Sequence, residues 1–81
     1  MFDKLKQLNQ IREMQNSLRE QRVEVERNGT KVIVNGNFGV EKIVLNPALG
    51  KEEQEKVLED ALNEAMKKVQ MLLVQKFSQM V

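Results

Sequence analysis

Residues 30–46 read T-K-V-I-V-N-G-N-F-G-V-E-K-I-V-L-N and predict a β-hairpin. In its first strand, Val32 and Val34 lie on one face and Ile33 lies on the other. The segment 35–39 between the strands is rich in Asn and Gly, which tolerate positive φ. A sheet with one solvent-exposed face would alternate apolar and polar residues. This hairpin therefore needs cover on both faces.

The second strand of the hairpin is apolar on both faces as well. Strict alternation predicts Val40 and Val44 on one face, with Ile43 and Leu45 on the other. A short chain has few other elements with which to cover so much apolar surface. The pattern therefore favours cover from a second copy of the chain.

A third strand is predicted just before the hairpin. Val23 and Val25 alternate with charged residues over 22–27, which is typical of a half-buried strand. Asn28-Gly29 follows and, like Asn35-Gly36, is a hairpin turn signal because both residue types accept positive φ. The sequence thus predicts three antiparallel strands, at residues 22–27, 31–36 and 39–46.

Two helices are predicted on either side of these strands. Over residues 2–21, apolar residues recur every three or four positions, at Phe2, Leu5, Leu8, Ile11, Met14 and Leu18. Residues 51–79 predict one long helix, with an apolar stripe of Leu58, Ala61, Leu62, Ala65, Val69, Leu72, Leu73 and Phe77. Met71 and Val74 lie off this stripe, so segment 69–74 is apolar nearly all round. Such a helix is usually buried on more than one side.

The chain has 81 residues and is predicted to be a single α+β domain over residues 1–81. A domain of this size buries only roughly 60% of its unfolded surface. It has no cysteine and no histidine, so packing or oligomerisation must supply the missing stability. We therefore expect a homodimer. Its expected interface consists of Ile33, Val69, Met71, Leu72, Leu73, Val74 and Phe77.

Catalysis has little support in this sequence. Without His and Cys, the commonest general base and the best nucleophile are missing. The acids of 51–64 have lysines three or four residues away, as on a solvated helix. No apolar run approaches the ~20 residues of a membrane span, and residues 1–4 do not open a signal peptide. We expect a cytoplasmic protein that is not an enzyme, with no cofactor, metal, small-molecule substrate or membrane partner.

The formal net charge of +1 conceals a segregated charge distribution. Residues 51–64 are strongly acidic, whereas residues 65–81 contain three lysines and no acid. Arg12 and Arg19 lie seven residues apart, on one helix face, with no acid three or four residues away. Unpaired arginines on one face suit phosphate contacts, although they would equally solubilise a helix or pair across a dimer interface. Lys56 differs, because four acids lie within one helical turn of it.

The order of elements and three short motifs resemble the YbaB/EbfC family of nucleoid-associated proteins. These motifs are V-I-V-N-G at 32–36, I-V-L-N-P-A-L at 43–49 and L-E-D-A-L-N-E-A at 58–65. The family usually has Asp at the position of Asn46. The resemblance covers essentially the whole chain.

The resemblance implies a small bacterial protein that forms an intertwined homodimer with helices projecting like tweezers. It also implies binding to double-stranded DNA with little sequence preference, for nucleoid organisation or gene regulation. We expect clustered phosphate contacts from Lys4, Arg12, Arg19, Arg22, Lys67, Lys68 and Lys76. The alternative is a dimeric protein-interaction or assembly module with no direct DNA role. It would present segment 69–74 or the acidic face of 52–60 to a protein partner.

Overall fold

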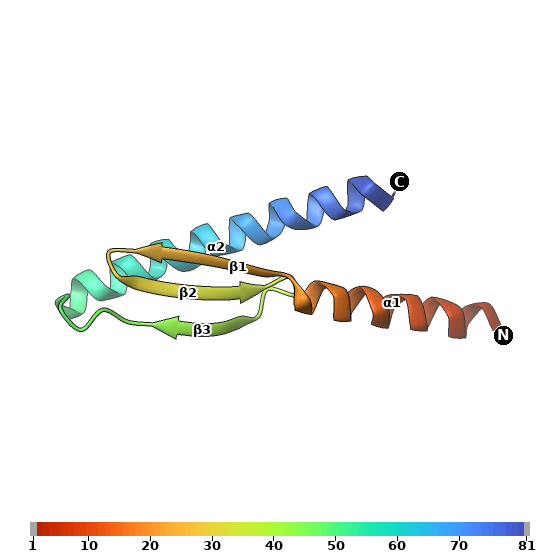
Figure 1. Ribbon diagram of the computed structural model, residues 1–81, viewed down its shortest axis with the longest axis horizontal. Helices are drawn as coiled ribbons and strands as arrows, with labels where there is room; N and C mark the ends of the chain where they lie inside the picture. The colour runs from red at the N-terminus through yellow and green to blue at the C-terminus, as the bar shows by residue number, and fades with distance from the viewer. Residues whose placement is uncertain (1, 81) are drawn as a thin grey trace.

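A computed structural model describes the backbone of residues 2–80 and the side chains of residues 4–78 (Figure 1). The side chain of Phe2, at the start of the predicted apolar stripe, lies outside the described residues. The elements are α1 (Phe2–Glu20), β1 (Arg22–Arg27), β2 (Thr30–Asn35), β3 (Val40–Val44) and α2 (Lys51–Met80). This is the predicted α+β order of one helix, three antiparallel strands and a long helix.

The three strands form one antiparallel sheet in the order β1-β2-β3. Val25 lies opposite Val32 and Val23 lies opposite Val34, so these four valines share one face of the sheet. Helix α2 runs along this face (Figure 1). The small side chains of Ala61 and Ala65 let the helix approach the strands closely. The buried core consists of Val25, Val32, Val34, Ala61, Ala65 and Val69.

Strand β3 departs from strict alternation. β2 pairs Val32 with Ile43 but pairs Val34 with Val40, so β3 contains one residue more than β2 over this stretch. The extra residue, Glu41, forms a β-bulge, which reverses the side on which the preceding residues lie. Val40 therefore shares a face with Ile43. The prediction that it shares a face with Val44 was wrong.

The two hairpin turns differ in how they reverse the chain. Asn28 and Gly29 have φ of 50° and 78°, which confirms the predicted turn between β1 and β2. In the turn between β2 and β3, however, the residue with positive φ is Phe38, at 61°. The expected turn signal Asn35-Gly36 therefore does not supply the positive φ. Gly36 is required for a close approach instead, because a Cβ there would collide with the backbone oxygen of Leu18.

The same close approach holds the end of α1 against the sheet. Gly36 N donates hydrogen bonds to the carbonyl oxygens of Leu18 (2.9 Å) and Gln21 (3.0 Å). Asn37 Nδ2 donates to Gln15 O at 3.2 Å. The bond to Leu18 O involves one of the last four carbonyl groups of α1, which have no partner further along the helix. Beyond this junction α1 projects away from the sheet (Figure 1).

Asn46 connects three segments at the opposite end of the sheet. Its Nδ2 donates to Asn28 O (2.8 Å), its Oδ1 accepts from Ala48 N (3.0 Å), and its backbone N donates to Gln54 Oε1 (3.0 Å). A carboxylate cannot donate the first of these bonds. The residue therefore ties the first hairpin turn to the loop that precedes α2.

We expect Asn46→Asp to lower the free energy of unfolding by about 1 to 2 kcal/mol, because the Asn28 carbonyl loses its donor and faces a carboxylate. Urea denaturation followed by circular dichroism measures the change. Asn63→Asp makes the same chemical change at an exposed position of α2 and should stay within about 0.5 kcal/mol of the unaltered protein. Equal stabilities of the two variants would refute the role assigned to Asn46.

Candidate nucleic-acid interface

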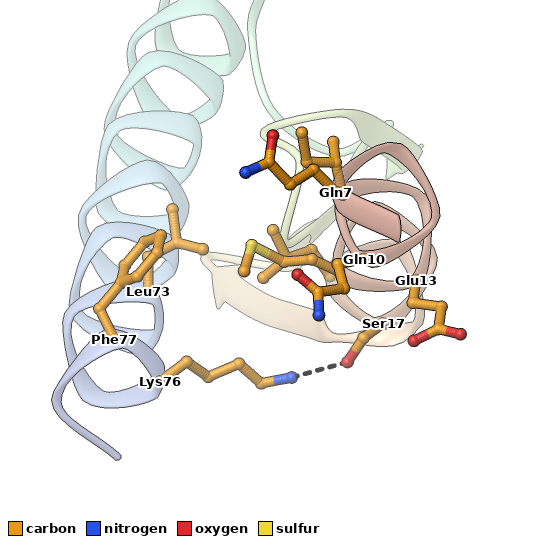
Figure 2. Close-up of a pocket in the computed structure, with 10 residues that line it drawn as sticks. Gln7, Gln10, Glu13, Ser17, Leu73, Lys76 and Phe77 are labelled. Atoms are coloured by element: carbon orange, nitrogen blue, oxygen red, sulfur yellow. Dashed lines mark hydrogen bonds between the residues drawn. The ribbon is translucent and has the colours of Figure 1, made fainter. Parts of the chain in front are cut away.

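Helix α1 and the C-terminal half of α2, residues 66–80, extend from the same end of the sheet and form two arms (Figure 1). Between the arms lies an open groove with a volume of about 790 Å³ (Figure 2). This arm groove is lined by Ile11, Met14, Leu18, Leu73 and Phe77, with polar side chains of Gln7, Gln10, Glu13, Ser17 and Lys76. One hydrogen bond spans it, from Lys76 Nζ to Ser17 Oγ at 3.0 Å (Figure 2).

Arg12 and Arg19 lie on the part of α1 that faces away from this groove. Each follows a groove residue, Ile11 or Leu18, and is therefore rotated by about 100° around the helix axis. Both side chains are exposed, and no described carboxylate lies within 4.0 Å of either guanidinium. Neither guanidinium therefore forms an ion pair with a described acid.

Three other predicted cations are equally accessible. Lys4 on α1 and Lys67 and Lys68 on α2 are exposed, and no described acid forms an ion pair with them. Lys4 thus lies on the same arm as Arg12 and Arg19, whereas Lys67 and Lys68 lie on the other. The two arms together present cationic side chains at one end of the molecule.

The other predicted cations already have partners within the chain. Arg22 Nε lies 2.8 Å from Glu41 Oε2, so β3 neutralises part of this charge. Lys76 is half-buried and donates to Ser17 across the arm groove. Both are therefore less available to a phosphate than Arg12 and Arg19.

Two lysines outside the predicted interface are also paired with acids. Lys31 Nζ lies 2.6 Å from Glu24 Oε1, and its hydrogen bond and charge interaction with this carboxylate raise the pKa of Lys31. Lys56 Nζ lies 3.4 Å from Asp60 Oδ1, which confirms the local pairing expected from the sequence. Lys42 on β3 was not among the predicted DNA contacts. It is exposed and has no described acid within 4.0 Å.

The contribution of Lys76 can be separated from that of its hydrogen bond. Ser17→Ala and Lys76→Met should each lower the free energy of unfolding by only about 0.5 kcal/mol, because the bond is exposed to solvent. An ammonium group has three donors, so Lys76 can hold Ser17 and a phosphate together. Lys76→Met alone should therefore reduce the salt dependence of DNA binding, but by less than the roughly one unit per chain that a full phosphate contact contributes. A reduction with Ser17→Ala as well would show that the hydroxyl contributes to the contact.

The residues predicted to form a dimer interface divide into three groups. Met71 and Val74 are each 65% exposed and Phe77 is 53% exposed. Ile33, Leu72 and Leu73 are half-buried. Val69 differs from both groups, because it is fully buried against the chain's own sheet and has no surface left for a partner. We therefore leave Val69 out of the surface proposed below.

Two further apolar surfaces were not included in the predicted interface. On α1, Leu5, Leu8 and Ile11 are between 52% and 59% exposed. On the sheet, α2 packs against β1 and β2, which leaves β3 exposed at Val40, Ile43 and Val44, and Leu45 directly after β3 is exposed as well. The sequence contained both signals, in the apolar stripe of the first helix and in the strand with two apolar faces.

An α+β domain whose helical arms present arginines and lysines that form no ion pair with a described acid has the features of a nucleic-acid-binding protein. The model of the YbaB/EbfC DNA-binding family matches residues 1–81, so the chain belongs to that family. The family comprises DNA-binding, nucleoid-associated proteins and is not a family of enzymes. No curated protein matched the chain. Among the described residues, no helix is both long and apolar enough to cross a membrane.

Proposed function

We propose that this protein binds double-stranded DNA as a homodimer, with little sequence preference, and thereby organises the bacterial nucleoid or regulates genes. The observation that carries the proposal is the pair Arg12 and Arg19, which are exposed on one side of α1 with no described carboxylate within 4.0 Å of either guanidinium. Exposed guanidinium groups bind phosphate oxygens in a bidentate geometry, through two parallel N–H···O hydrogen bonds. The site of action would be the nucleoid in the cytoplasm.

Phosphate contacts explain why little sequence preference is expected. Contacts to the DNA backbone fix position and affinity, whereas sequence is read at the base edges in the grooves. The proposed contacts are made by cationic side chains on two arms, which suits binding to a regular array of phosphates. The proposed set is Lys4, Arg12, Arg19, Lys67 and Lys68, with smaller contributions from Arg22 and Lys76.

The exposed surface of the chain supports the proposed dimer. A single chain exposes 6431 Å². A compact monomer of its mass, 9.4 kDa, would expose only about 5,000 Å². The excess, roughly 1,400 Å² per chain, corresponds to a total interface in the range of obligate homodimers. The radius of gyration is 16.5 Å, compared with about 12 Å for a compact chain of this length, which points to the same conclusion.

The proposed interface uses the exposed apolar residues of α1, β3 and the C-terminal half of α2. Exposed apolar residues that gather into large patches normally mark an interaction surface on a soluble protein. Two copies would also double each cationic site, and linked weak sites bind far more tightly than single ones. Dimerisation and DNA binding are thus coupled in this proposal.

Val74→Asp tests the dimer with little effect on the chain's own core. Val74 is 65% exposed, so a charge at this position is solvated in the single chain but buried without a partner in a dimer. We expect sedimentation at micromolar concentration to give twice the chain mass for the unaltered protein and a lower average mass for the variant. Gln75→Asp places the same charge one residue further along and serves as the control. An unaltered protein that sediments as a stable monomer would contradict the proposal.

Electrophoretic mobility shifts on two unrelated duplexes, repeated over a series of salt concentrations, test the DNA part. Binding through phosphates should weaken steeply with salt and to the same extent on both duplexes. An apolar interface with a protein partner does not weaken in this way. No binding at low salt would refute the proposal and favour the protein-interaction module.

A further inference from the structure

Phe38 has an unusual backbone conformation for a bulky residue. Its φ is 61°, in the left-handed region that Gly, Asn and Asp adopt far more readily than aromatic residues. The ring is not buried in compensation, since Phe38 is 41% exposed. It belongs neither to the core nor to the lining of the arm groove. Packing within the chain therefore gives no reason for a phenylalanine at this position.

The turn that contains Phe38 is held in place by its own hydrogen bonds. Asn35 Oδ1 accepts from Asn37 N (2.9 Å) and from Gly39 N (3.0 Å). Two backbone hydrogen bonds close the same turn. Asn35 N donates to Gly39 O (2.9 Å), and Phe38 N donates to Asn35 O (3.1 Å). These bonds stabilise the strained conformation, so the turn holds the backbone of Phe38 in a fixed position. Strain that the surrounding structure maintains in this way is typical of functional positions.

The position of the turn relates the ring to the proposed DNA contacts. Asn37 Nδ2 donates to Gln15 O, so the turn lies against the last part of α1, at the end of the sheet where the arms begin (Figure 1). Gln15 lies between Arg12 and Arg19 on that helix. A duplex bound along the outer side of α1 would therefore come close to Phe38.

We infer that Phe38 is an additional DNA contact, whose ring wedges against or between base pairs of a duplex held by the arginines. Apolar side chains inserted in this way unstack a base step from the minor groove and bend the duplex. Because every base has an aromatic face, the contact adds affinity without reading sequence. The inference rests on the proposed function and deepens it.

A tryptophan at this position provides a direct test, because the chain contains neither Trp nor Tyr. Phe38→Trp should retain DNA binding, and its fluorescence should be quenched by duplex DNA, through stacking on bases, but not by inorganic polyphosphate. Ala48→Trp, in the exposed loop at the opposite end of the sheet, is the matched control and should respond to neither. A Phe38→Trp protein that binds duplex DNA without loss of fluorescence would overturn the inference.

Phe38→Asn tests the same contact by removing the ring. Asparagine tolerates positive φ, so the turn and the fold should be retained. We expect DNA affinity to fall by at least about fivefold, with less bending of a doubly labelled duplex in energy-transfer measurements. The salt dependence should stay unchanged, because no cation is lost.

Two results for Phe38→Asn, and one for the unaltered protein, would each overturn the inference. Unchanged affinity and bending would show that the ring does not contact DNA. A fall in sedimented mass would assign Phe38 to the contact between two copies. If the unaltered protein itself fails to bind duplex DNA, the proposed function fails together with the inference, whereas the first two results leave the proposed function intact.

Discussion

Arg12→Ala combined with Arg19→Ala should weaken binding to duplex DNA by at least about a hundredfold at low salt, equally on unrelated sequences. Both guanidinium groups are exposed, and neither has a described carboxylate within 4.0 Å. Their charge is therefore available to phosphates. In the proposed dimer the double substitution removes four phosphate contacts. Each contact contributes about 0.9 to the slope of log affinity against log salt, so the slope should fall by roughly three to four units. Fluorescence anisotropy over a salt series measures both quantities.

Lys56→Ala is the control for this experiment. It also removes one positive charge from an exposed helix position, but that charge is already paired with Asp60 at 3.4 Å. It should therefore change affinity and salt slope very little. The fold should survive all three substitutions, since none of these side chains is buried. If Lys56→Ala weakened binding as much as the double arginine variant, a different surface would have to contact the DNA.

The regular elements were predictable because their hydrophobic periods are distinct. Alternation at Val23 and Val25 gave the first strand, and the three-or-four spacing gave both helices. The stripe that includes Ala61 and Ala65 also identified the side of α2 that packs on the sheet. These features depend on residues close together in sequence, so the chain alone contains them.

The bulge and the second turn were not predictable from the same periods. The position of Val40 depends on the pairing of β3 with β2, in which no residue of β2 lies opposite Glu41. Asn35-Gly36 resembles a turn signal, yet the two hydrogen bonds accepted by Asn35 Oδ1 shift the positive φ to Phe38. In both places, contacts formed by the folded chain override the local preference.

The candidate site shows the same division. The pairing of Lys56 was visible, because its partner lies four residues away on the same helix. The partners of Arg22 and Lys76, in contrast, lie on other elements and meet them only in the folded chain. Val69 was assigned to an interface because its apolar neighbours surround the helix, whereas the sheet of its own chain covers it completely.

Gly36→Ala should lower the free energy of unfolding by about 2 to 3 kcal/mol, a large part of the stability of so small a domain. The added Cβ would collide with the backbone oxygen of Leu18, and backbone cannot yield as a flexible side chain does. Moving the turn away from α1 would break the bonds from Gly36 N to Leu18 O and Gln21 O. Thermal and urea denaturation measure the loss.

Gly50→Ala is the matched control, since a Cβ there meets no atom within 4 Å. It should lower stability by no more than about 1 kcal/mol, because Gly50 is the N-cap of α2 and Ala is less favourable there than Gly. A larger loss for Gly36→Ala therefore reports the contact between α1 and the turn. Because this junction sets the direction of α1, Gly36→Ala should also weaken DNA binding although no charge is lost, and the salt slope should be retained. Equal stability of Gly36→Ala and Gly50→Ala would mean that α1 meets the sheet in a different way, and the position of Arg12 and Arg19 would then have to be reassigned.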